Sequence, residues 1–90
     1  MENIEIIHIG NQIKKRVLEK DINIKELMMC FRCSNQKIVR MLNSSNMKTD
    51  LLMKWSLILD YDFFNFYTHE FLLRKEFNKN QAIILKKNDL

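Results

Sequence analysis

Residues 25–42 read KELMMCFRCSNQKIVRML, and this stretch decides the expected fold. Its apolar anchors lie at relative positions 0, 4, 6, 11 and 14, and they are Leu27, Phe31, Cys33, Ile38 and Met41. This spacing predicts two short helices joined by a tight turn, each burying one face against the same core. Such a pair is a candidate helix-turn-helix.

The second helix of this pair, residues 34–43, has a polar outer face. Ser34 is expected to cap its start, and the outward side chains that follow are Asn35, Gln36, Lys37, Val39 and Arg40. In the major groove, amides suit adenine edges, Arg and Lys suit guanine, and an aliphatic group suits the thymine methyl. Inserted there as a recognition helix, this segment would place four side chains near base edges, namely Asn35, Gln36, Lys37 and Arg40.

The sequence on either side predicts three more helices. Ile9, Ile13 and Val17 recur every four residues and indicate a first helix. Asn23 is the expected N-cap of the first helix of the pair described above. A fourth helix opens at Thr49, and its apolar residues are Leu51, Leu52, Trp55, Ile58 and Leu59. A fifth, aromatic-rich helix is expected to start at Asp60 or Asp62, and the core is expected to include Trp55, Phe63 and Phe64.

Composition supports an all-α fold. Ninety residues allow one domain, and 47% hydrophobic with 29% charged residues is a globular composition. Proline is absent and glycine occurs only at Gly10, which argues against sandwiches and barrels with their many turns. No apolar run approaches the roughly 18 residues of a membrane span. The N-terminus lacks the features of a signal peptide, so we expect a cytoplasmic protein with no membrane contact.

Charge is unevenly distributed along the chain. Residues 14–48 contain nine Lys or Arg against three acidic residues, a net charge of +6, whereas residues 49–73 sum to −3. The basic segment is a candidate footprint for a polyanion, although a solvated helix face in a lysine-rich protein has the same charge. On a DNA backbone, the residues expected to hold phosphates are Ser34, Lys25, Lys48, Lys14 and Lys15.

Several motifs together resemble a known family. They are IGNQIK at residues 9–14, IKEL at 24–27, CSN at 33–35, and TDLLxxxSxxLDYDFF at 49–64. The chain resembles small phage-repressor-like (XRE-type) helix-turn-helix proteins, in particular a compact group common in Bacteroidetes, over residues 9–70. The resemblance implies a five-helix DNA-binding domain, a role in transcriptional regulation, most simply as a repressor, and a dimer.

Three positions depart from the family pattern. Met28 stands where a small residue is usual because two helices approach closely, and Arg32 stands at the turn where glycine is usual because φ is positive. Lys48 replaces an acidic residue common at the start of the next helix. These departures motivate an alternative function, a protein–protein adaptor that keeps the fold and has lost DNA binding.

Other constellations are weaker. Cys30 and Cys33 form a CxxC, but His8 and His69 lack the spacing that would complete a zinc site. The single glycine excludes phosphate-binding glycine loops, and no nucleophile–base arrangement is visible. We therefore expect no catalytic residues, no cofactor, no metal and no small-molecule substrate.

The two ends fall outside the five-helix unit. Residues 1–8 are predicted to be an N-terminal arm or strand, and residues 71–90 a C-terminal extension used for dimerisation. Both contain apolar runs too large to leave in water, and residues 4–9 and 82–85 could pair as short strands. A homodimer would also supply two recognition helices, one for each half-site of the DNA. The alternative is a tail that folds back on its own monomer as a helical hairpin.

Overall fold

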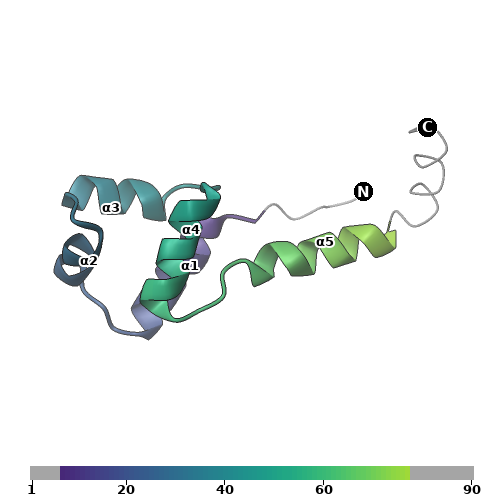
Figure 1. Cartoon of the computed structure of the whole chain (residues 1–90), viewed down its shortest axis with the longest axis horizontal. Coiled ribbons are helices and arrows are strands. Elements are labelled where there is room, and N and C mark those ends of the chain that lie inside the picture. Colours follow the sequence, from purple (N-terminus) through teal and green to yellow (C-terminus); the bar gives the residue numbers. More distant parts are fainter. Residues whose placement is uncertain (1–6, 78–90) are drawn as a thin grey trace.

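The computed structural model describes residues 7–77 of the chain, which form five helices and no strand (Figure 1). The helices are α1 (Ile9–Glu19), α2 (Ile24–Phe31), α3 (Asn35–Leu42), α4 (Thr49–Leu59) and α5 (Asn65–Phe77). For these residues the expected all-α, five-helix architecture is confirmed. None of these helices is long and apolar enough to cross a bilayer.

The expected terminal strands fall largely outside the described residues, as do residues 1–6 of the arm and 78–90 of the extension. Within the described part, Ile7 and His8 belong to no strand, and Ile9 is the first residue of α1. Helix α5 runs without a break across residues 70 and 71, where we expected the extension to begin.

Capping side chains fix where α1 and α2 begin. The His8 Nδ1 accepts a hydrogen bond from the Asn11 amide at 3.1 Å, which caps α1. Asn23 and Glu26 form a capping box at α2, in which each side chain accepts from the other residue's backbone N–H. These caps satisfy amides that lack partners in the first turn of a helix.

The core lies among α1, α2, α3 and α4, which group together at one end of the molecule (Figure 1). Its buried members are Ile9, Ile13, Val17, Leu27, Ile38, Met41, Leu52, Trp55, Leu59 and Phe63. Three of the five anchors of residues 25–42 are therefore buried, while Phe31 and Cys33 are half-buried and pack against the core edge. The Phe31 ring lies 4.4 Å from that of Trp55, which adds an aromatic contact to the apolar burial.

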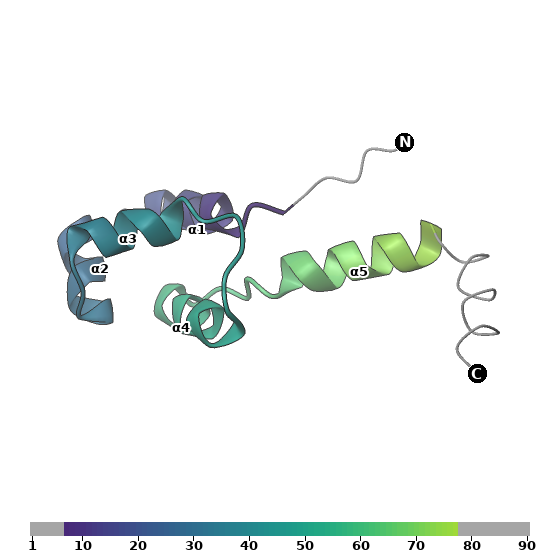
Figure 2. The same cartoon turned by 90° about the horizontal axis from the view of Figure 1, so that it is seen from above.

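Helix α5 extends away from the other four helices in both views (Figure 1 and Figure 2). It begins at Asn65, later than the predicted start at Asp60 or Asp62. Asp60 adopts the left-handed conformation that ends α4 (φ 50°), and the Asp62 carboxylate accepts from the Phe64 amide at 3.0 Å. The two aspartates thus build the turn before α5 rather than its first residues.

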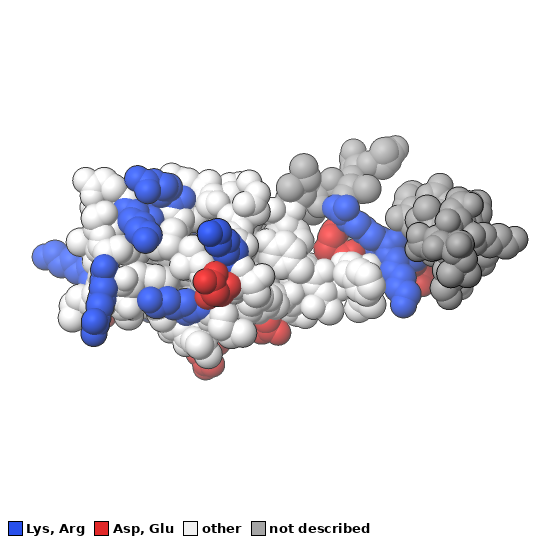
Figure 3. Space-filling view, turned by 45° about the horizontal axis from the view of Figure 1, so that its top comes forward, with Lys and Arg blue, Asp and Glu red and all other residues white. Residues whose placement is uncertain are grey.

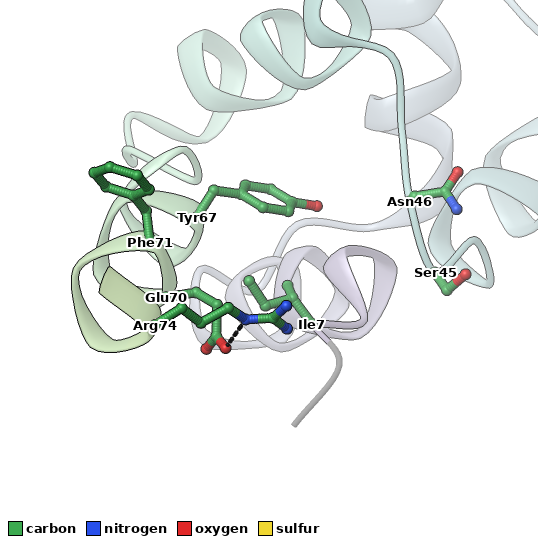
Figure 4. Close-up of a pocket in the computed structure, with 7 residues that line it drawn as sticks. All are labelled: Ile7, Ser45, Asn46, Tyr67, Glu70, Phe71 and Arg74. Atoms are coloured by element: carbon green, nitrogen blue, oxygen red, sulfur yellow. Dashed lines mark hydrogen bonds and ion pairs between the residues drawn. The ribbon is translucent and has the colours of Figure 1, made fainter. Parts of the chain in front are cut away.

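A pocket of about 370 Å³ separates α5 from the loop that follows α3 (Figure 4). Its lining residues are Ile7, Ser45, Asn46, Tyr67, Glu70, Phe71 and Arg74. Glu70 and Arg74 form an ion pair at 2.7 Å on the α5 side. Desolvation by partial burial raises the pKa of the Tyr67 hydroxyl above its usual value. Of the α5 residues, only Phe66, near its start, packs against the core within the described part.

Candidate nucleic-acid interface

Helix α3 has two chemically distinct faces. Ile38 and Met41 are 0% and 6% exposed and anchor it to the core. The polar residues on the opposite side are all exposed, and they are Asn35, Gln36, Lys37 and Arg40. Because residues four apart share a helix face, Gln36 and Arg40 lie together along the outer surface. The four residues predicted to read base edges are therefore free of protein contacts that would cover them.

The entry into α3 is fixed by Arg32 and Ser34. Arg32 ends α2 in the left-handed region (φ 53°, ψ 52°), where glycine is usual and an arginine carries strain. The Ser34 Oγ then accepts from the Lys37 amide at 3.2 Å and caps α3. The turn expected at this point is thus formed despite the arginine. Met28, another of the three departures from the family pattern, is half-buried and packs against the core.

The exit from α3 is fixed by the backbone of α1. The Gly10 amide donates to the Ser44 carbonyl at 2.9 Å, and the Ile9 amide donates to the Ser45 carbonyl at 3.2 Å. A Cβ on Gly10 would lie 2.5 Å from that Ser44 oxygen and closer still to the Leu42 carbonyl oxygen. The chain's only glycine is therefore needed because the two segments approach backbone to backbone.

The predicted phosphate contacts come from four helices or their caps. Lys15 and Lys25 are exposed on α1 and in the first turn of α2. Lys48 is exposed at the N-cap of α4 and makes no side-chain capping bond, since an ammonium group cannot accept from backbone N–H groups. The Ser34 hydroxyl already accepts from Lys37 but retains its own proton to donate.

Lys14 differs from the other predicted phosphate contacts because it is half-buried. Its Nζ donates to the Asn43 Oδ1 at 3.4 Å, which joins α1 to the residue that ends α3. The ammonium group has three donors, so it can hold this bond and still face an anion. Asn43 and Gly10 are residues that sequence reasoning missed. The only available signal was a lone glycine within a helical pattern.

Figure 3 views the molecule with the α3 side turned forward. Basic side chains gather there on the surface formed by α1 to α4. Acidic side chains are fewer there. Two other cations of this part are engaged with the protein itself. Arg16 pairs with Glu19 at 3.2 Å and lies over the Tyr61 ring at 4.7 Å, and the Lys54 Nζ lies 5.2 Å from the centre of the Phe31 ring.

No cluster of three or more His, Cys, Asp or Glu side chains in residues 7–77 could hold a metal ion. Cys30 is exposed and Cys33 half-buried, and both are free thiols. His8 serves as a helix cap instead.

No protein-family model, curated protein or solved structure matches this chain. The resemblance to phage-repressor-like proteins therefore stays a prediction, and the functional argument depends on the geometry of α3 and its surroundings.

Proposed function

We propose that the chain is a sequence-specific double-stranded DNA-binding protein of the cytoplasm, a small transcriptional regulator that acts as a repressor. The observation that carries the proposal is α3, a capped helix whose outer face offers only amide, cationic and aliphatic groups. An α-helix with its side chains is about 10–12 Å across, which matches the roughly 12 Å width of the major groove.

Within this proposal, the outer residues of α3 divide by chemistry. Gln36 and Asn35 can form paired hydrogen bonds with adenine, and Arg40 and Lys37 can donate to guanine. Val39, which is 45% exposed, offers a methyl surface for thymine. The phosphate contacts at Ser34, Lys14, Lys15, Lys25 and Lys48 would supply affinity and set the register of the helix without reading sequence.

We further propose that the working form is a homodimer joined through α5. Phe71, Leu72 and Leu73 are 61%, 55% and 54% exposed, and successive helix residues point about 100° apart. Phe71 and Leu73 line pockets shared with the loop after α3 and with the start of α1, but all three side chains keep more than half of their surface exposed. A second chain would cover them and would place two copies of α3 on one DNA duplex.

Selection of bound sequences from a random DNA pool, followed by mobility shift at two salt concentrations, tests the DNA proposal. We expect a preferred site. Binding should weaken steeply from about 50 to 200 mM salt, because the release of counterions from DNA is less favourable at higher salt concentration. Absence of binding at about 50 mM salt, or binding without salt dependence, would favour the adaptor alternative.

Sedimentation of the full chain at about 100 μM tests the dimer, because even a micromolar complex forms at this concentration. We expect a dimer for the native chain and for Leu18→Glu, which alters an exposed leucine on α1. Leu72→Glu should shift the chain to monomer. A monomeric native chain would contradict the dimer and favour the tail that folds back on its own domain.

A further inference from the structure

A shallow apolar groove runs along the outer side of α2, next to the turn that leads into α3. Its lining residues are Lys25, Met28, Met29, Arg32 and Cys33, and its volume is about 520 Å³. Met29 is 77% exposed, the highest value among the large hydrophobic residues of the described part. A methionine pair is a soft, adaptable surface that fits apolar side chains of different shapes.

The rim of the groove is cationic. Lys25 and Arg32 are both exposed, and within residues 7–77 neither takes part in an ion pair. The lining contains no acidic residue. The acidic residue beside Lys25 in the chain, Glu26, accepts from the Asn23 amide at 3.0 Å in the capping box and does not line the groove. Two positive charges that form no ion pair within residues 7–77 therefore flank an apolar floor.

We propose that this groove binds an acidic peptide segment of a partner protein, with a bulky apolar side chain on the methionines and carboxylates on Lys25 and Arg32. Charge complementarity selects an anionic occupant, and the apolar floor selects one that carries hydrophobic side chains as well. A phosphate backbone alone would leave the floor uncovered.

The position of the groove gives this partner a regulatory effect, a step that depends on the proposed DNA binding. Lys25 is a proposed phosphate contact, and the Ser34 cap of α3 directly follows Cys33, which lines the groove. An acidic segment seated there would occupy the Lys25 ammonium group and add negative charge beside the DNA-facing helix. The peptide and DNA should therefore exclude one another.

The test uses the full chain with methionine methyl groups labelled with ¹³C. The probe is an acetylated eight-residue peptide that alternates acidic residues with leucine and phenylalanine, and the control peptide replaces each acid with lysine. We expect the acidic peptide to move the Met28 and Met29 methyl signals saturably and to leave Met41, Met47 and Met53 in place. Met53 is 47% exposed on α4. An equal shift of the Met53 methyl signal, or a shift of the methyl signals with the lysine peptide, would contradict the proposed binding site.

Two variants that introduce a negative charge sharpen the result. Met29→Glu should weaken peptide binding at least about tenfold, a change of about 1.4 kcal/mol, whereas Met53→Glu places the same charge on another exposed methionine and should not. Unchanged binding in Met29→Glu would contradict the inference. Binding to phosphatidylserine vesicles with no response to the peptide would also overturn it, since it would identify an anionic membrane surface instead.

Competition separates this inference from the proposed function. We expect the acidic peptide to release labelled DNA from the full chain at concentrations that saturate the Met29 signal. If the peptide binds the groove and the chain binds no DNA, the groove stands and the proposed function fails. If the chain binds DNA and the peptide moves no methionine signal, the proposed function stands and the groove fails.

Discussion

Helices α3 and α5 both present uncovered surfaces, but the surfaces differ in kind. Helix α3 buries Ile38 and Met41 and exposes amides and cations, so its free face is stable in water. Helix α5 exposes Phe71, Leu72 and Leu73 in three directions. The first surface suits a polar, anionic ligand, whereas the second requires protein contact to leave water. Under the proposed function, α3 would supply the surface for DNA and α5 the surface for dimerisation.

The two helices also differ in how firmly they are held. Helix α3 is capped by Ser34 and followed by a loop that accepts two amides of α1. In the described part, α5 packs against the core only through Phe66 and borders a pocket on the side facing the loop after α3. Substitutions on the buried face of α3 should therefore affect the stability of the monomer, and substitutions of the exposed residues of α5 beyond Phe66 should not.

The largest expected effect comes from Ile38→Ala on the inner face of α3. Removing this fully buried side chain leaves a cavity and should lower the free energy of unfolding by about 2–5 kcal/mol. Leu72→Ala on α5 should change it by less than about 0.5 kcal/mol at concentrations where the chain is monomeric. Urea unfolding followed by the fluorescence of Trp55, the single and fully buried tryptophan, measures both. Similar losses in the two variants would show that α5 is packed within the monomer.

The next effect concerns the attachment of α3 to α1. Gly10→Ala should lower the free energy of unfolding by about 1–3 kcal/mol, because the new methyl group meets backbone carbonyls that cannot rotate aside. Asn11→Ala, at the exposed neighbouring position, is the matched control and should be close to neutral. Thermal unfolding reports the difference. In an open helix the glycine change would stabilise by up to about 1 kcal/mol, so an increase in Tm would contradict the close approach.

A third effect tests the free face of α3 directly. Arg40→Ala should weaken binding to the selected DNA site by about 1–3 kcal/mol and relax sequence preference at one position. Lys48→Ala should weaken all sequences alike and reduce the slope of log K against log salt by about one. Binding isotherms on selected and random DNA distinguish these outcomes. An equal loss on both DNAs for Arg40→Ala would mean that α3 is not the recognition helix.

The smallest effect compares the turns that lead into α3 and α5. Arg32 and Asp60 both end a helix in the left-handed region, with φ values of 53° and 50°. Aspartate tolerates this conformation better than arginine. Arg32→Gly should therefore stabilise the chain by about 0.5–1 kcal/mol, and Asp60→Gly by less. A larger gain from Asp60→Gly in chemical unfolding would reverse this ranking.

Local sequence pattern was sufficient for the five helices and for most of the core. Leu27, Ile38 and Trp55 are buried as their spacing predicted, because each lies on an apolar face with the helical period. Phe63 is buried as expected too, but it lies in the turn between α4 and α5. Phe64, the next residue of the same turn, is only half-buried, although the core was expected to include it. The start of α5 was wrong because aspartates favour turns as readily as helix caps.

Contacts between distant segments could not be predicted from the sequence. The requirement for Gly10 arises from Leu42 and Ser44, more than 30 residues away, and no local period encodes that approach. The bond between Lys14 and Asn43 is equally non-local. In the candidate interface, the exposure of the α3 side chains followed from periodicity, but the backbone attachment that orients them did not.

The attachment of α3 at both ends has a consequence for the kinetics of recognition. Ordering the backbone of one residue costs about 1–2 kcal/mol of conformational entropy, and the eight residues of α3 are already ordered before any ligand arrives. Under the proposed function, docking of α3 on DNA would be a rigid encounter, limited by diffusion, orientation and electrostatic steering rather than by a coupled folding step. The association rate should respond to the charge of the surrounding surface and be indifferent to the intrinsic helix propensity of the residues on the outer face of α3.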